Sequence, residues 1–162
     1  MDCPITEQDK QFMQAAIDAS LNSIKTGGGP FGAVITKDGK IIAEAANCVV
    51  PNHDPTCHAE VHCIRKACEA LGTHVLKGCN IYTSCEPCPM CLGAIYWARI
   101  EKIFMANTRE DAKNIDFDDS FIYDEIKKED LKTRTIPVIT MKDTNAIEAF
   151  KEWKRNTEKV HY

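Results

Sequence analysis

The sequence predicts an α/β fold with a mixed sheet of about five strands. Three observations support this fold class. A hairpin signal joins two short apolar runs near the start of the chain. Apolar segments of strand length then alternate with segments of helical period, which is typical of a sheet covered by helices. No internal repeat or linker divides the 162 residues, so the length suits a single domain, 1–162.

The N-terminal part is expected to form a helix followed by a hairpin. Thr6 and Asp9 form a capping pattern ahead of apolar residues at helical spacing, which predicts a helix over residues 7–25. The glycines and the proline that follow end this helix. The dipeptide Asp38-Gly39 between apolar runs is a hairpin turn signal. The predicted hairpin strands are residues 31–36 and 41–47.

The rest of the chain continues the alternation of helices and strands. The apolar spacing predicts helices over residues 58–71, 89–98 and 146–153 and strands over residues 79–83, 103–106 and 136–141. Gly72 suits the C-cap of the first of these helices. The segment 109–130 holds nine Asp and Glu residues and is expected to be a solvated surface. Its stretch Phe117-Asp118-Asp119-Ser120-Phe121 is the exception, because it is too aromatic for mere solvation.

The charge and hydropathy of the chain argue against two classes of protein. The formal net charge is −4, and no basic stripe is present, which argues against broad binding of a nucleic acid backbone. No apolar run approaches the roughly 20 residues that a membrane span requires. The N-terminus, Met1-Asp2-Cys3-Pro4, does not resemble a secretory signal. We therefore expect a cytoplasmic protein without a membrane partner.

Two short motifs carry the chemistry of the sequence. The sequence holds nine cysteines, and in a reducing compartment a cysteine pattern points to a metal or to catalysis before it points to disulfides. Cys88 and Cys91 lie three residues apart at the predicted start of a helix, where the helix dipole favours the thiolate form. Thirty residues upstream, His58 and Glu60 supply an imidazole and a carboxylate.

These residues predict a zinc site with one open position. Two sulfur atoms and one nitrogen give three protein ligands, and a catalytic zinc keeps its fourth position for water. Glu60 would then act as the general acid and base rather than as a ligand. His-x-Glu together with Pro-Cys-x-x-Cys is the signature of zinc deaminases. On an ideal helix, residues 58 and 60 lie about 200° apart, so His58 is expected at the irregular start of its helix.

Several other interpretations of the same residues stay open. The Cys-x-x-Cys pair could be a redox dithiol, and Cys85 could extend it to a three-thiolate or iron–sulfur site. His62, four residues after His58, could close a structural Cys2His2 site in a non-catalytic, zinc-stabilised module. This last alternative leaves Glu60 without a role. Cys57 is expected to be a buried thiol.

At these motifs the sequence resembles the cytidine deaminase superfamily, and within it most closely the bacterial guanine deaminases. The resemblance covers nearly the whole chain. The segments that carry it are Gly28–Val34, Asp54–Val61, Tyr82–Arg99, Phe117–Tyr123 and the terminal Tyr162. The zinc motif is common to the superfamily, whereas the acidic-aromatic stretch and the terminal tyrosine point to guanine.

The resemblance implies a fold, a reaction and a partner. The fold would have three layers, α/β/α. The chain would be a homodimer, and its C-terminal segment, about residues 142–162, would be exchanged between subunits. The reaction would be the zinc-dependent hydrolysis of guanine to xanthine and ammonia. A deaminase of another aminated base or nucleoside, or of adenosine in tRNA, is the alternative, although the net charge of −4 disfavours a large polyanion.

The resemblance also implies a role for each candidate site residue. His58, Cys88 and Cys91 would hold Zn²⁺, and Glu60 would move protons. The remaining four would bind the substrate: Asn47 by hydrogen bonds to the purine, Phe31 by ring contact, and Asp119 and Tyr162 by recognition of the substrate or of its leaving amine. The glycines Gly28, Gly29 and Gly32 would let the backbone approach a flat ligand closely.

Overall fold

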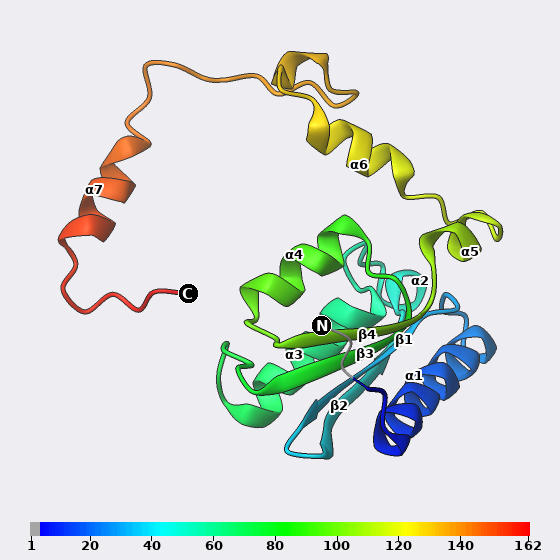
Figure 1. Cartoon of the computed structure of the whole chain (residues 1–162). Helices are drawn as coiled ribbons and strands as arrows, with labels where there is room; N and C mark the ends of the chain where they lie inside the picture. Colours follow the sequence, from blue (N-terminus) through cyan, green and yellow to red (C-terminus); the bar gives the residue numbers. More distant parts are fainter. Residues whose placement is uncertain (1–3) are drawn as a thin grey trace. The chain divides into compact units, whose positions relative to one another are not determined.

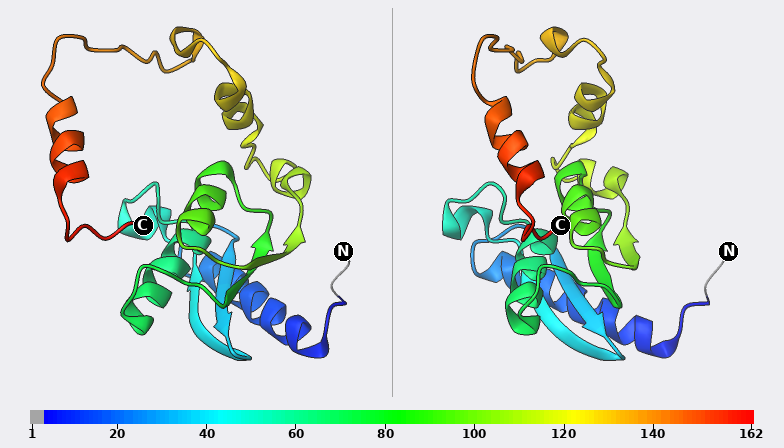
Figure 2. Two further views of the ribbon diagram at one scale, coloured as in Figure 1. Left: turned by 60° about the vertical axis from the view of Figure 1, so that its left-hand side comes forward. Right: turned by 90° about the vertical axis from the view of Figure 1, so that its left-hand side faces the viewer.

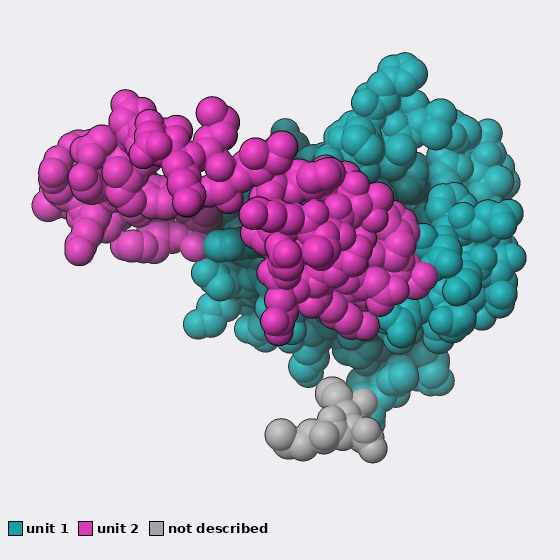
Figure 3. Space-filling view, turned by 90° about the horizontal axis from the view of Figure 1, so that it is seen from above, with its two compact units in different colours: residues 1–119 teal, residues 120–162 magenta. Residues whose placement is uncertain are grey.

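The computed structural model describes residues 4–162. The N-terminal residues 1–3, on which part of the signal-peptide prediction depends, lie outside the described residues. The chain forms two compact units, residues 1–119 and residues 120–162, which Figure 3 shows in different colours.

The first unit is built on one mixed sheet of four strands in the order β2-β1-β3-β4 (Figure 1). The strands are β1 (Gly32–Lys37), β2 (Lys40–Ala46), β3 (Cys79–Cys85) and β4 (Lys102–Asn107). β1 pairs antiparallel with β2 and with β3, whereas β3 and β4 are parallel. The predicted hairpin is confirmed, with positive φ at both Asp38 and Gly39, as its tight turn requires.

Helices cover both faces of this sheet, which confirms the three-layer α/β/α fold (Figures 1 and 2). On one face, Val34 and Tyr82 pack with Ala16 of α1 (Glu7–Lys25). On the other face, Ala33 and Ile35 join a larger core with residues of α3 (Ala59–Leu71) and α4 (Pro89–Trp97). Successive side chains of β1 therefore point to opposite faces of the sheet and belong to two separate cores. Two short helices, α2 (Val49–Asn52) and α5 (Arg109–Lys113), complete the unit.

Helix boundaries follow the signals in the sequence. α1 begins after Thr6, whose side chain accepts a hydrogen bond from the Asp9 N–H while the Asp9 carboxylate accepts one from the Thr6 N–H. α3 ends at Gly72, which takes the left-handed conformation predicted for a C-cap. Close packing of α1 against β1 depends on Gly32, because a Cβ atom there would lie 2.1 Å from the Ala16 carbonyl oxygen.

The second unit contains helices α6 (Ser120–Lys127) and α7 (Ile147–Arg155) and the 3-10 turn η1 (Leu131–Thr133). The predicted fifth strand, residues 136–141, is wrong, since this segment is irregular. Pro137 lacks the N–H that a ladder needs. Ile136 and Ile139 are more than 80% exposed, so their apolar character reflects no packing within this unit.

No helix among residues 4–162 is long and apolar enough to cross a membrane.

Candidate metal and catalytic site

The sheet topology brings the predicted site residues of the first unit together at one end of the strands, where β2 and β3 end and β1 begins. β3 ends at Cys85 and leads directly to Cys88 at the start of α4. Because β1 runs antiparallel to β2 and β3, its beginning lies beside their ends, with Gly32 opposite Ala46 and Ala33 opposite Thr83. Phe31 and Asn47 are therefore neighbours, and the Asn47 N–H donates to the Phe31 carbonyl at 3.0 Å.

Three candidate metal ligands meet at this end of the sheet, and they come from the first residues of two helices, α3 and α4. The Nδ1 atom of His58 lies 3.6 Å from the Sγ atoms of both Cys88 and Cys91. His58 is the N-cap of α3, with extended backbone at ψ 155°. Cys88 is the N-cap of α4, and Cys91 lies in its first turn. The expectation that His58 precedes the regular part of its helix is confirmed.

The three side chains fit a zinc ion. Zinc bonds of about 2.3 Å to sulfur and 2.0–2.1 Å to nitrogen at tetrahedral angles place the nitrogen and sulfur atoms about 3.5 Å apart, close to the 3.6 Å found here. The set holds two thiol sulfurs and one imidazole nitrogen, a combination that zinc prefers. Three ligands leave a coordination position for water or substrate, as catalytic zinc sites require.

The local electrostatics already favour charge separation in this site. A hydrogen bond from the Cys91 thiol, together with contact to His58, lowers the pKa of Cys88 to about 4 despite its burial. The same hydrogen bond to Cys88 raises the pKa of Cys91. The pKa of His58 is raised, first because of its hydrogen bond to Cys88. These contacts favour the thiolate form of Cys88, and a bound cation would favour the thiolate form of Cys91 as well.

Glu60 lies in the first turn of α3 and is only 6% exposed. Burial raises the pKa of its carboxyl group, and a hydrogen bond with Cys91 places it beside the ligand set. A carboxyl group whose pKa moves toward neutrality can both accept and return a proton at physiological pH. His58 and Glu60 thus face one site although they are two residues apart.

The structure places three of the four predicted substrate-binding residues in the first unit. The buried Asn47 accepts hydrogen bonds at Oδ1 from the N–H groups of Gly29 and Val49, at 3.3 and 3.2 Å. The Phe31 ring makes an edge contact with Phe117, with ring centroids 5.0 Å apart. Asp119 is half-buried. Its pKa is raised by burial and next by the charge of Cys88, which places it near the ligand set.

Tyr162 belongs to the second unit, where its side chain is 70% exposed. Its role in substrate binding stays a prediction. The approach of a ligand to the predicted glycines likewise stays a prediction, but two of them already have a packing role. A Cβ atom at Gly32 would meet α1, and one at Gly28 would meet Ser23 Oγ and the Asn47 carbonyl oxygen at 2.2 and 2.3 Å. These close approaches are made by the protein's own chain.

Two alternative ligand sets receive no support from the geometry. Cys85 lies 3.6 Å from the Thr108 carbonyl oxygen, and burial raises its pKa to about 11. Of the described residues, those grouped with Cys88 and Cys91 as possible ligands include neither Cys85 nor His62. His62 instead lies with Cys48 and Cys57 in a second group of possible metal ligands. Sequence reasoning missed this group, because the three positions have no recognisable metal-ligand spacing.

Comparison with known proteins gives three findings that agree with this site. The profile of the cytidine and deoxycytidylate deaminase zinc-binding region matches residues 6–107. Guanine deaminase from Bacillus subtilis (strain 168) is 51% identical over 152 residues, which are 93% of this chain and 97% of the relative. The X-ray structure of guanine deaminase from Bacillus subtilis matches with a TM-score of 0.91 at 50% identity, over 94% of this chain and 98% of that one.

A further relative shares only part of the chain. The tRNA-specific adenosine deaminase from Aquifex aeolicus (strain VF5) is 41% identical over 95 residues, which are 59% of this chain and 63% of that protein. The two kinds of relative thus differ in how much of the chain they match.

Proposed function

Because the chain belongs to the cytidine and deoxycytidylate deaminase family, we propose that it hydrolyses guanine to xanthine and ammonia. The observation that carries this proposal is the meeting of His58, Cys88 and Cys91 beside the buried Glu60. The choice of guanine is supported by the Bacillus subtilis guanine deaminase, whose similarity spans 93% of the chain. The similarity to the Aquifex aeolicus tRNA deaminase spans only 59%.

His58, Cys88 and Cys91 would hold the zinc ion. When bound, zinc supplies Lewis-acid activation, which lowers the pKa of water from 15.7 to about 7 in favourable sites. The backbone of two ligands is tied into the helices that follow them. The His58 carbonyl accepts from the His62 N–H, and the Cys88 carbonyl accepts from the Leu92 N–H, both at 2.9 Å.

Glu60 would move the protons. It takes one proton from the attacking water and gives it to the ring nitrogen next to C2 of guanine. It then takes the proton of the hydroxyl group now on C2 and gives it to the amine, so that the C2–N bond breaks, the C2 carbonyl forms, and the products are xanthine and ammonia. Its burial supports this role, because a desolvated carboxyl group has a raised pKa and returns a proton readily near neutral pH.

Four residues would bind the purine: Asn47, Phe31, Asp119 and Tyr162. Asn47 is held by two backbone N–H groups, so its side chain is oriented before substrate arrives. The ring of Phe31 is likewise fixed by Phe117. Asp119, with its raised pKa near Cys88, is suited to contact the amine.

The working form would be a homodimer in which the C-terminal segment closes the partner's site. Support comes from the second unit, whose large apolar side chains are widely exposed, including Phe150 at 75% and Met141 at 78%. Exposed apolar surface of this extent is typical of interaction sites.

The cytoplasm is the proposed compartment, because the eight described cysteines are free thiols, as in reducing compartments.

A substrate panel tests the proposed reaction. The zinc-loaded protein is incubated separately with guanine, adenine, cytosine, cytidine and an unmodified tRNA, and ammonia is measured together with the deaminated product. We expect ammonia from guanine with xanthine in equal amount. Inosine formation in tRNA without xanthine would replace guanine by adenosine as the substrate.

A further inference from the structure

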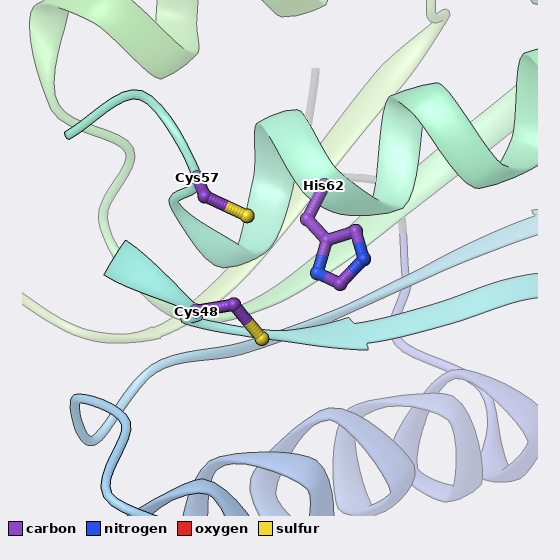
Figure 4. Close-up of side chains that lie close together, drawn as sticks. All are labelled: Cys48, Cys57 and His62. Carbon is purple, nitrogen blue, oxygen red and sulfur yellow. The ribbon is translucent and has the colours of Figure 1, made fainter. Parts of the chain in front are cut away.

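A second group of metal-ligand side chains lies outside the site described above. Cys48 follows β2 and precedes α2, Cys57 precedes His58, and His62 is in the second turn of α3. Their two sulfur atoms and one imidazole nitrogen all lie within 4.8 Å of one another. Figure 4 shows both sulfur atoms and the imidazole ring directed into the same space between the end of β2 and the start of α3.

The backbone holds these side chains in place before any ligand binds. The Cys48 N–H donates to the Cys57 carbonyl at 3.0 Å, which ties the two cysteine-bearing segments together. The imidazole of His62 is fixed by the 3.2 Å contact between its Nδ1 atom and the Ala46 carbonyl oxygen. The three side chains therefore lose little conformational freedom when an ion binds.

Burial and hydrogen bonding suit a metal site. Cys57 is 2% exposed, whereas Cys48 and His62 are half-buried, so an ion can reach the group from solvent. Asn52 Nδ2 donates to Cys57 Sγ at 3.5 Å. Hydrogen bonds of this kind to a sulfur ligand orient it and favour its thiolate form.

We propose that Cys48, Cys57 and His62 form a second binding site for a thiophilic divalent cation such as zinc or cadmium. Two thiolates and a neutral imidazole balance the charge of such an ion, and soft sulfur ligands select it over magnesium or calcium. Tetrahedral bonding to zinc would bring the ligand atoms to about 3.5–3.8 Å from one another. Since the ligand atoms lie no more than 4.8 Å apart, the largest contraction that this geometry requires is about 1 Å.

This site is separate from the catalytic group and does not depend on the proposed reaction. The two groups adjoin at two points, because Cys57 directly precedes His58 and the His62 N–H donates to the His58 carbonyl oxygen at 2.9 Å. An ion bound here would cross-link the segment after β2 to α3, next to the residue that presents the catalytic imidazole.

The test counts metal ions in the full-length protein. The wild type and the variants Cys48→Ser and Cys88→Ser are dialysed against cadmium with a phosphine reductant, desalted, and analysed for bound metal by mass spectrometry. Thiolate-to-cadmium absorption in the ultraviolet is recorded in parallel. Cys68→Ser is the matched control, because Cys68 is a half-buried cysteine on α3 outside both ligand groups.

We expect two ions per chain in the wild type and in Cys68→Ser, and one ion in Cys48→Ser and in Cys88→Ser. Loss of an outer hydrogen-bond partner of a ligand lowers metal affinity by about 10–100-fold. Loss of a ligand itself should lower the affinity for the second ion by at least as much. His62→Gln provides an independent variant should Cys48→Ser fold poorly, and it should also retain one ion. One ion in the wild type, or two ions in both Cys48→Ser and His62→Gln, would overturn the proposal.

Discussion

His58 and Glu60 are two residues apart, yet a helix boundary passes between them, and this boundary lets both face one site. His58 has extended backbone with ψ 155° as the N-cap of α3, whereas Glu60 lies inside the first helical turn. On a continuous helix the two side chains would diverge by about 200°. The short motif therefore works because it spans the start of a helix.

The metal-free protein should carry a reactive Cys88. Contact with Cys91 and His58 holds the pKa of Cys88 at about 4, so its thiolate is fully present at pH 6. Cys85, whose pKa is raised to about 11, and Cys63, raised to about 12, stay protonated there. Alkylation by iodoacetamide at pH 6, followed by peptide mass spectrometry, should label Cys88 first.

Zinc loading is the control for this labelling, and it should protect Cys88. An alkylation rate of Cys88 that rises tenfold per pH unit between pH 6 and pH 8 would show an ordinary thiol, contrary to this prediction.

Tyr82→Phe should destabilise the first unit in a pH-dependent manner. Tyr82 donates a hydrogen bond of 2.5 Å to Asp9, and the pKa of Asp9 is lowered first by the Thr6 hydroxyl and then by Tyr82. The folded pKa lies below the unfolded value, so this stabilisation is present above pH 3.8 and is lost as pH falls through the folded pKa. At pH 7 the free energy of unfolding should fall by about 0.5–1.5 kcal/mol, because solvent close to the Asp9 carboxylate screens the bond.

Urea unfolding at intervals from pH 7 down to pH 2 measures this difference, with the exposed Tyr96→Phe as a control. A loss that stays constant over this whole range would mean that the ionised carboxylate contributes nothing to the bond.

Gly32→Ala should destabilise the packing of α1 on the sheet. The added Cβ atom would lie 2.1 Å from the Ala16 carbonyl oxygen and 2.6 Å from the Ser20 nitrogen, which are backbone atoms that move only with the helix. Overpacking of this kind costs about 1–3 kcal/mol, measured as a lower urea midpoint. Gly93→Ala is the control, because nothing lies within 4 Å of its added Cβ atom. Equal stability of the two variants would refute the packing role.

Deletion of residues 160–162 should abolish turnover while zinc content stays unchanged, because the proposed exchange places Tyr162 over the partner's substrate. Subunit mixing tests the exchange itself. A dimer of one tail-deleted chain and one Glu60→Gln chain has a single site with both an intact Glu60 and an intact tail. Mixing the two inactive proteins should therefore restore part of the activity. No recovery in proven mixed dimers would argue that each tail serves its own chain.

The sequence predicts most of the first unit because local signals and tertiary packing agree there. The capping pair Thr6 and Asp9, the turn at Asp38 and Gly39 and the cap at Gly72 each appear as predicted. The segment 136–141 shows where this reasoning fails. Its apolar residues resemble a strand, but a strand also needs a neighbour, and no local pattern reveals whether one exists.

The two groups of metal ligands differ in the same way. His58, Cys88 and Cys91 are predictable because two of them share one helix start and the third belongs to a short motif with Glu60. Cys48, Cys57 and His62 come together through the hydrogen bond between two loops and the position of α3 beside β2. Their proximity is a property of the fold, so spacing along the chain gave no signal.

The most direct test of the central claim compares Glu60→Gln with the wild type. Both proteins are loaded with zinc, their metal content is measured, and xanthine release from guanine is followed. Glu69→Gln is the matched control, since Glu69 lies on the exposed face of the same helix. We predict that the catalytic zinc content is the same in all three proteins. Turnover should fall by about 10²–10⁴-fold in Glu60→Gln alone. Unchanged xanthine release by zinc-loaded Glu60→Gln would contradict the assignment of Glu60 as the proton-transfer group.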